Sequence, residues 1–92
     1  MIKIYGREMC NFCDRAMMVC EQYGLEYTYK NVDDRFEGET YMAELKALAE
    51  EQNLTFKTVP QIWMHGKYVG GYNELLSELE NGNIGNFGQG AV

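Results

Sequence analysis

The sequence is poor in proline, in cysteine, in basic residues and in long apolar runs. It holds one proline and three cysteines, and its eight Lys and Arg against fourteen Asp and Glu give a formal charge of −6. Such a charge repels phosphate backbones and anionic lipids, so we expect no nucleic-acid and no membrane partner. The opening run MIKIYG is too short for a signal peptide, and no stretch approaches the roughly 20 apolar residues that span a bilayer. We therefore expect a cytoplasmic protein.

The chain is long enough for one domain with one core. Its 92 residues are 46% apolar and 24% charged, which is typical of a globular domain. Three cysteines are an odd number, whereas a small secreted domain held by disulfides normally carries an even set of four or more. Cys10 and Cys13 are spaced Cys-x-x-Cys, which in a reducing compartment indicates redox chemistry or metal binding. No apolar interface is evident, so we expect a monomer.

Hydrophobic periodicity predicts seven elements in the order βαβαββα. The predicted ranges are 2–5, 12–23, 26–32, 40–52, 59–64 and 67–69, and a last helix starts at residue 72 and is stopped by Gly82. His65-Gly66 predicts a tight hairpin between the last two strands. A strand, helix and strand at the start require parallel neighbours, and the hairpin adds an antiparallel pair. The expected fold class is α/β, a mixed four-stranded sheet flanked by three helices in one domain, 1–82, followed by a glycine-rich tail, 83–92, to which we assign no function.

The same spacing predicts where single side chains lie. In the helix over 40–52 the apolar face includes Leu45 and Ala49, and Glu44 is expected to face solvent with the other charged residues. In the first helix Cys20 belongs to the apolar stripe, which favours a small buried hydrophobe.

Cys10 lies where a loop meets the first turn of a helix. Unpaired N–H groups and the helix dipole favour a thiolate there, and such cysteines have pKa values of roughly 3.5–7.5 against about 8.5 for a free thiol. Cys13 follows one turn later, within the Cα separation of about 4.4–6.8 Å that a disulfide needs. The pair predicts attack by Cys10 on a substrate disulfide, then release of the product by Cys13, which we expect to be the more buried thiol.

Zinc binding is the main alternative for this pair. A structural zinc site needs about four ligands, and only Cys20 and His65 remain as soft donors. No second Cys-x-x-Cys exists in the sequence. We therefore favour redox chemistry and expect no metal.

Three segments together resemble the glutaredoxin family, and specifically the small dithiol glutaredoxins of bacteria and their phages. They are Tyr5-Gly6-Arg7 before Cys10-Asn11-Phe12-Cys13, Thr58-Val59-Pro60-Gln61-Ile62, and Gly70-Gly71-Tyr72-Asn73-Glu74-Leu75. The resemblance spans roughly residues 1–80. It implies a thioredoxin-like fold and a glutathione-dependent thiol–disulfide oxidoreductase that reduces protein disulfides and glutathione mixed disulfides, with ribonucleotide reductase as a candidate substrate.

The resemblance also implies which residues contact glutathione as co-substrate. They are Arg7, Phe12, Lys57, Thr58, Val59, Pro60, Gly71, Asn73 and Glu74. It implies a cis peptide bond before Pro60, which leaves the backbone of Val59 free to pair with the glutathione peptide. Arg7 and Lys57 match basic positions that meet the glycine carboxylate.

The helix after Gly70-Gly71 would point its N-terminus at the γ-glutamyl carboxylate, with Asn73 as its cap. Glu74 replaces the family's usual Asp, which faces the ligand's α-amino group, and it is equally explained as an acid favoured by the helix dipole. Asn11-Phe12 replaces the common Pro-Tyr, which removes a fixed φ and a hydroxyl. Phe12 either packs against substrate or joins the helix stripe.

Two other functions remain open on sequence grounds. A thioredoxin-like redoxin, reduced directly by a flavoprotein reductase, would need Cys10 and Cys13 but no glutathione site. An iron–sulfur carrier would hold a cluster between Cys10 of two chains and two glutathione molecules. The retained Cys13 disfavours the carrier, because an intramolecular disulfide competes with the cluster.

Overall fold

A computed structural model describes residues 1–82, and the predicted tail, 83–92, lies outside the described residues. The order βαβαββα is confirmed. The elements are β1 (Ile2–Gly6), α1 (Asn11–Gln22), β2 (Tyr27–Asn31), α2 (Gly38–Glu51), β3 (Gln61–Met64), β4 (Lys67–Gly70) and α3 (Tyr72–Glu80). Among the helices of residues 1–82, none has the length and hydropathy that spanning a bilayer requires.

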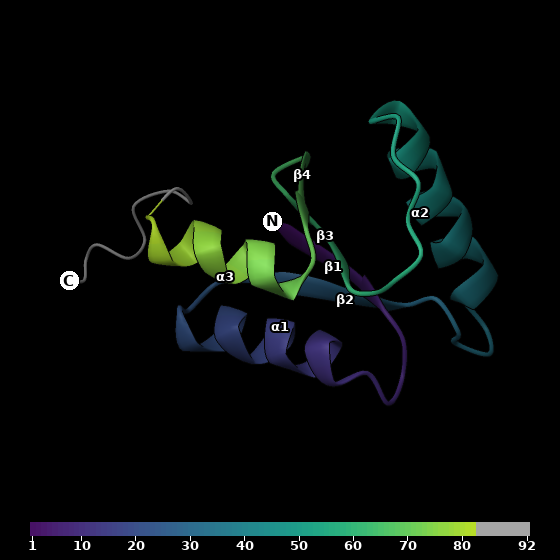
Figure 1. Ribbon diagram of the computed structural model, residues 1–92. Helices are drawn as coiled ribbons and strands as arrows, with labels where there is room; N and C mark the ends of the chain where they lie inside the picture. The colour runs from purple at the N-terminus through teal and green to yellow at the C-terminus, as the bar shows by residue number, and fades with distance from the viewer. Residues whose placement is uncertain (83–92) are drawn as a thin grey trace.

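The strands form one mixed sheet in the order β2-β1-β3-β4. β1 pairs with β2 in parallel, while β1 with β3 and β3 with β4 are antiparallel. In Figure 1, α1 and α3 lie side by side along one face of this sheet, and α2 stands apart on the other. The expected α/β class with three flanking helices is confirmed.

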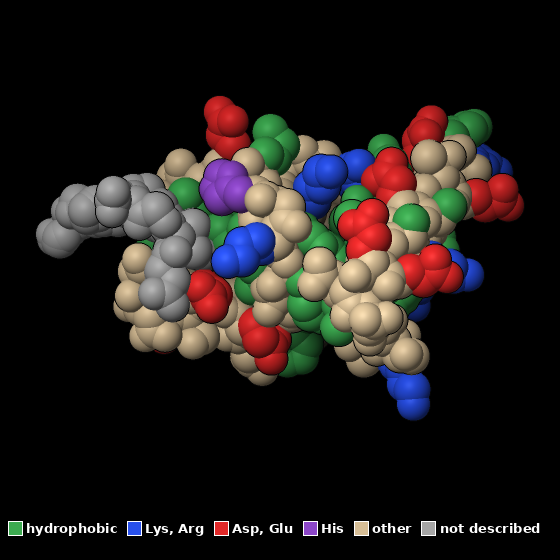
Figure 2. Space-filling view, turned by 90° about the horizontal axis from the view of Figure 1, so that it is seen from above, with side chains coloured by type: hydrophobic (Ala, Val, Ile, Leu, Met, Phe, Trp, Pro, Cys, Tyr) green, Lys and Arg blue, Asp and Glu red, His purple; other side chains and the backbone are tan. Residues whose placement is uncertain are grey.

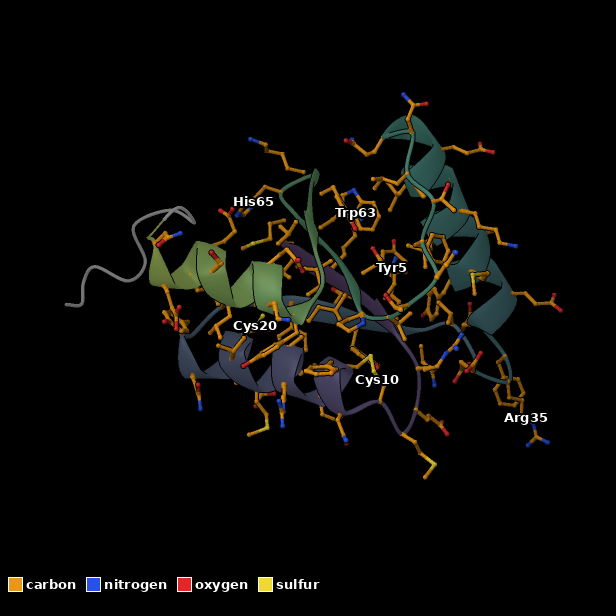
Figure 3. All side chains as sticks on the ribbon, viewed as in Figure 1. Tyr5, Cys10, Cys20, Arg35, Trp63 and His65 are labelled. Carbon is orange, nitrogen blue, oxygen red and sulfur yellow. A yellow bond between two sulfur atoms is a disulfide. The ribbon has the colours of Figure 1, made fainter. Side chains whose placement is uncertain are left out.

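Alternation along the strands divides the core between the two faces. One cluster joins α1 and α3 to the sheet through Ile2, Ile4, Ala16, Val19, Cys20, Ile62, Met64, Leu75 and Leu79. The other lies under α2 and contains Tyr5, Val32, Leu45 and Trp63. The rings of Tyr5 and Trp63 meet edge to face, 5.9 Å apart and at 85°. Figure 3 shows both between the sheet and α2, with Cys20 on the side of α1.

Glu44 reaches toward the sheet although its side chain is 39% exposed, so the prediction that it faces solvent holds only in part. Its Oε1 accepts hydrogen bonds from the Tyr5 hydroxyl at 3.0 Å and from Lys30 Nζ at 2.7 Å. The Lys30 ammonium also lies over the rings of Tyr5 and Tyr41, at 5.7 and 5.4 Å. A mostly buried ammonium and a buried phenol both need a polar partner, and Glu44 on α2 supplies it. Burial and the Glu44 hydrogen bond raise the pKa of Tyr5.

The Glu44 contacts predict a dependence of stability on pH. The Lys30 hydrogen bond lowers the pKa of Glu44 in the folded protein below the ordinary glutamate value of about 4.3. A depressed folded-state pKa stabilises above the unfolded pKa, and this contribution disappears as the pH falls through the folded value. Urea unfolding should therefore show Glu44→Gln less stable than wild type at neutral pH, with the difference shrinking below about pH 4. An equal difference at all pH values would contradict this, and Glu50→Gln, exposed on the same helix, is the control.

Two elements start two residues away from their predicted ranges. α2 starts at Gly38 rather than residue 40, because the Asp34 carboxylate accepts the N–H groups of Phe36 and Glu37, at 3.0 and 2.8 Å, and opens the helix early. β3 starts at Gln61 rather than residue 59.

The predicted hairpin turn between β3 and β4 is confirmed, because His65 and Gly66 both have positive φ. Asn73 is not the cap of α3, since the helix begins one residue before it and Gly71 is the capping residue.

Candidate active site

Cys10 is the N-cap residue of α1. Its backbone is extended, with φ −121° and ψ 105°, and its Sγ accepts the N–H of Cys13 at 3.2 Å. This hydrogen bond and the unpaired N–H groups of the first turn place positive dipole ends at the sulfur. Figure 3 shows Cys10 at the N-terminal end of α1. The predicted acidity of Cys10 stays a prediction, because neither sulfur of a disulfide titrates.

Cys10 and Cys13 form a disulfide, with their Cα atoms 5.2 Å apart. Cys13 has 0% exposure whereas Cys10 is partly exposed, which confirms the expected order of burial. Only Cys10 is therefore presented to a partner disulfide. Cys20 is a free thiol inside the α1 and α3 core, where burial raises its pKa to about 11. This confirms Cys20 as a buried hydrophobe.

The segment before β3 closes the site on the other side of Cys10. The Val59–Pro60 peptide bond is cis, and the Val59 carbonyl oxygen lies 3.8 Å from Cys10 Sγ. Gln61 fixes this segment from inside the protein, since its Nε2 donates a hydrogen bond to the Thr58 carbonyl oxygen at 2.8 Å. The Gln61 Oε1 accepts from the Tyr68 hydroxyl at 2.7 Å. Gln61 is only 7% exposed, so its amide links the active-site segment to β4 inside the protein.

We expect Gln61→Leu to loosen the segment that carries Val59. The substitution keeps the volume but leaves the Thr58 carbonyl and the Tyr68 hydroxyl without their partner, which costs about 1–3 kcal/mol. Thermal unfolding should reveal the loss of stability, and steady-state kinetics should show a larger rise in KM for the thiol substrate than fall in kcat. Tyr68→Phe is the control, because it removes the outer hydrogen bond and leaves the one to Thr58. Equal kinetics in wild type and Gln61→Leu would contradict the positioning role.

A groove of about 340 Å³ opens beside the Cys10 end of α1. It is lined by Phe12, Thr58, Val59, Pro60, Gly71, Tyr72, Asn73 and Glu74. The segment before β3, the start of α3 and the first turn of α1 thus meet at one place, although they are distant in sequence. Seven of the residues predicted to contact glutathione line this groove: Phe12, Thr58, Val59, Pro60, Gly71, Asn73 and Glu74.

Phe12 and Tyr72 form one wall of this groove. Phe12 is 49% exposed, so it does not join the buried stripe of α1. Its ring lies 6.0 Å from that of Tyr72, and the Arg15 guanidinium lies 5.3 Å over it. Tyr72 was not among the predicted site residues, because its apolar character and spacing are equally those of the α3 core face. An aromatic residue directly after two glycines was the available signal.

Glu74 folds back over the start of its own helix. Its Oε1 accepts the Gly71 N–H at 2.9 Å, and a Cβ on Gly70 would meet its Cγ at 2.9 Å. The carboxylate therefore satisfies one unpaired N–H at the positive end of α3. This arrangement matches the capping explanation of Glu74, and the side chain also lines the groove.

The two predicted basic residues do not line the groove. Arg7 Nε pairs with Asp33 Oδ2 at 3.1 Å, and both side chains are about half exposed. Lys57 is exposed and directly precedes the lining residue Thr58. Figure 2 shows Lys and Arg side chains interspersed with Asp and Glu on the face that it draws.

Comparison with known proteins decides the family. A family model described as glutaredoxin matches residues 2–69. The chain is 34% identical to glutaredoxin 1 of Escherichia coli over 77 residues, which cover 80% of this chain and 86% of that protein. The chain belongs to the glutaredoxin family. It is also 32% identical to glutaredoxin-C6 of rice (Oryza sativa), over 84 residues that cover 90% of this chain and 70% of the relative.

Solved glutaredoxin structures share the fold. A buckwheat glutaredoxin, solved in complex with glutathione, superposes with a TM-score of 0.73 at 22% identity, covering 94% of this chain and 74% of that one. Glutaredoxin 1 of Francisella tularensis superposes with a TM-score of 0.64 at 26% identity, covering 87% and 92%. The thioredoxin-like fold expected from the resemblance is confirmed. As a glutaredoxin with a Cys10–Cys13 pair, the protein is a thiol–disulfide oxidoreductase.

Proposed function

We propose that this glutaredoxin takes its electrons from glutathione and reduces protein disulfides and glutathione mixed disulfides. The observation that carries the proposal is the groove beside Cys10, which is lined by residues from three separate segments. It offers backbone polar groups at Val59, an aromatic wall at Phe12 and the N-terminus of α3, which suits a small anionic peptide. The buckwheat glutaredoxin of the same fold was solved with glutathione bound, which supports the proposal.

The reaction follows from the different exposure of the two sulfurs. The Cys10 thiolate attacks one sulfur of the substrate disulfide, forms a mixed disulfide and expels the other sulfur as a thiolate. With a protein disulfide, the Cys13 thiolate then attacks Cys10 Sγ, releases the second substrate thiolate and leaves the Cys10–Cys13 disulfide. One glutathione thiolate reopens this disulfide as a mixed disulfide on Cys10, and a second glutathione removes the first as oxidised glutathione. Two electrons thus pass from two glutathiones to the substrate.

The remaining contacts of the proposal concern the charged ends of glutathione. The α3 N-terminus, at Gly71 and Asn73, would receive the γ-glutamyl carboxylate, and Glu74 would face the α-amino group. Arg7 and Lys57, which flank the site outside the groove, would reach the glycine carboxylate. For Arg7 this requires sharing its guanidinium with Asp33.

The decisive experiment couples the protein to glutathione, glutathione reductase and NADPH, with a small glutathione mixed disulfide as substrate. Consumption of NADPH that depends on both the protein and glutathione supports the proposal. An inactive protein whose disulfide is instead reduced by a thioredoxin reductase would show that it is a redoxin and that the groove is not a glutathione site.

The proposal extends to the setting of the reaction. The odd number of cysteines and the free Cys20 thiol suit a reducing compartment, so we place the protein in the cytoplasm. We also propose a monomer, because the sequence shows no evident apolar interface. Ribonucleotide reductase, which the family resemblance implies, is the protein substrate to test first. The same coupled assay, with oxidised ribonucleotide reductase in place of the small disulfide, provides that test.

A further inference from the structure

In the resolving step Cys13 attacks the mixed disulfide on Cys10, and the burial of Cys13 works against this reaction. Cys13 must become a thiolate before it can attack the mixed disulfide on Cys10, but its side chain has 0% exposure. Burial away from polar groups disfavours a thiolate. Within residues 1–82 the Cys13 sulfur accepts no hydrogen bond in the disulfide form. A donor close to Cys13 Sγ would remove this obstacle.

The Tyr29 hydroxyl lies close to this sulfur. Both groups pack against the same side of Gly6, at the end of β1. A Cβ on Gly6 would stand 2.8 Å from Cys13 Sγ and 2.9 Å from Tyr29 Cζ, and it would collide with the Tyr29 hydroxyl oxygen as well. The phenol and the Cys13 sulfur therefore share the volume that a side chain at position 6 would fill, and glycine there lets them approach each other.

The Tyr29 hydroxyl is held as a proton donor. It donates to the Arg7 carbonyl oxygen at 2.9 Å in the disulfide form, in the loop that leads to Cys10. Burial raises the pKa of Tyr29, and the carboxylates of Asp14 on α1 and Glu8 in the loop raise it further, so the phenol keeps its proton at neutral pH. A hydroxyl rotates about its C–O bond at little cost, so the same proton can turn toward a second acceptor.

We propose that in the reduced protein the Tyr29 hydroxyl donates a hydrogen bond to the Cys13 sulfur and stabilises its thiolate for the resolving step. The thiol proton of Cys13 goes to water, while Tyr29 keeps its own proton and turns from the Arg7 carbonyl to the sulfur. The thiolate then forms its bond to Cys10 Sγ as the bond from Cys10 to the substrate sulfur breaks. The inference deepens the proposed function, since it concerns the step that protein disulfides need and glutathione mixed disulfides do not.

The test compares Tyr29→Phe with wild type on both kinds of substrate. Loss of the donor should raise the pKa of Cys13 by about one unit, which lowers its thiolate fraction tenfold at neutral pH. Because a more basic thiolate is also more nucleophilic, protein-disulfide reduction should slow only about threefold. Turnover of a glutathione mixed disulfide, which needs Cys10 alone, should be unchanged. Tyr27→Phe is the matched control, because that hydroxyl lies on the same strand and donates to Glu21.

A second measurement needs no glutathione and therefore separates this inference from the proposed function. In a Cys10→Ser background, the rate of iodoacetamide alkylation at Cys13 is followed against pH by peptide mass spectrometry. The Tyr29→Phe profile should move to higher pH, and above the shifted pKa the variant should react at least as fast as its parent. An unchanged profile, or an equal loss with both substrates, would overturn the inference. If instead wild type fails to turn over glutathione mixed disulfides, the proposed function fails while the alkylation profile still decides the role of Tyr29.

Discussion

Cys10→Ser is expected to abolish reduction of both protein disulfides and glutathione mixed disulfides. Cys10 is the partly exposed sulfur, and it alone stands at the N-terminus of α1, where the Cys13 N–H reaches it at 3.2 Å. A serine hydroxyl stays protonated at neutral pH and cannot replace the thiolate that attacks disulfides. The coupled NADPH assay with each substrate should fall to the rate of the uncatalysed exchange. Substantial activity with either substrate would contradict the assignment of Cys10 as the nucleophile.

Cys13→Ser should separate the two reactions instead of removing both. Without the resolving thiol, the mixed disulfide between Cys10 and a protein persists, whereas a second glutathione still releases a glutathionylated Cys10. Protein-disulfide reduction should be lost, and the small mixed disulfide should still turn over at a rate of the same order as wild type. Cys20→Ala is the control, because this buried thiol lies in the core and should leave both rates unchanged.

Gly70→Ala is expected to unfold at a lower temperature and to bind glutathione more weakly. Gly70 has φ +122°, a conformation that L side chains rarely adopt, and such strain costs about 1–3 kcal/mol. An added Cβ would also meet Glu74 Cγ at 2.9 Å and push the first turn of α3 away from the groove. For a domain of this size each kcal/mol lowers Tm by about 4–8 °C. Calorimetry and the KM for glutathione measure the two effects.

Two further variants separate strain from collision at Gly70. Gly82→Ala introduces a side chain at φ +70° with nothing within 4 Å, so it should lower Tm without changing KM. Adding Glu74→Ala to Gly70→Ala removes the atoms that collide, although it also removes the carboxylate that accepts the Gly71 N–H. The double variant should therefore recover part of the lost stability. A Gly70→Ala protein with the Tm of wild type would show that the backbone relaxes there at no cost.

Local patterns predicted the elements well because each follows from neighbours in the chain. Gly24, Gly66 and Gly82 all have the positive φ that helix ends and tight turns require, and they mark those turns correctly in the sequence. The errors arose where a distant group decided the outcome. Glu44 has the charge and spacing of an exposed residue, yet Lys30 and Tyr5 on two strands bring it to the sheet.

The groove was predicted through three short segments and their resemblance to one family, not through its shape. Gln61 and Tyr29 were missed because neither carries a local signal. A glutamine after a proline is as common on a surface as in an interior, and an aromatic residue in a strand is expected in any sheet. The role of Gln61 depends on its hydrogen bond to the Thr58 carbonyl. The role that we propose for Tyr29 depends on its packing beside Gly6, next to the Cys13 sulfur.

The amino-acid sequence by itself favoured thiol–disulfide chemistry for this protein, because two cysteines one helical turn apart at the start of a helix lie close enough to form a disulfide. It also determined the order of the elements, because hydrophobic period and turn residues act over a few positions. Only the tertiary structure decided that Tyr72 joins the groove and that Gln61 supports it through hydrogen bonds to Thr58 and Tyr68. Those outcomes depend on the packing of α1 and α3 against one sheet face, which brings Phe12 and Glu74, 62 positions apart in the chain, to one groove.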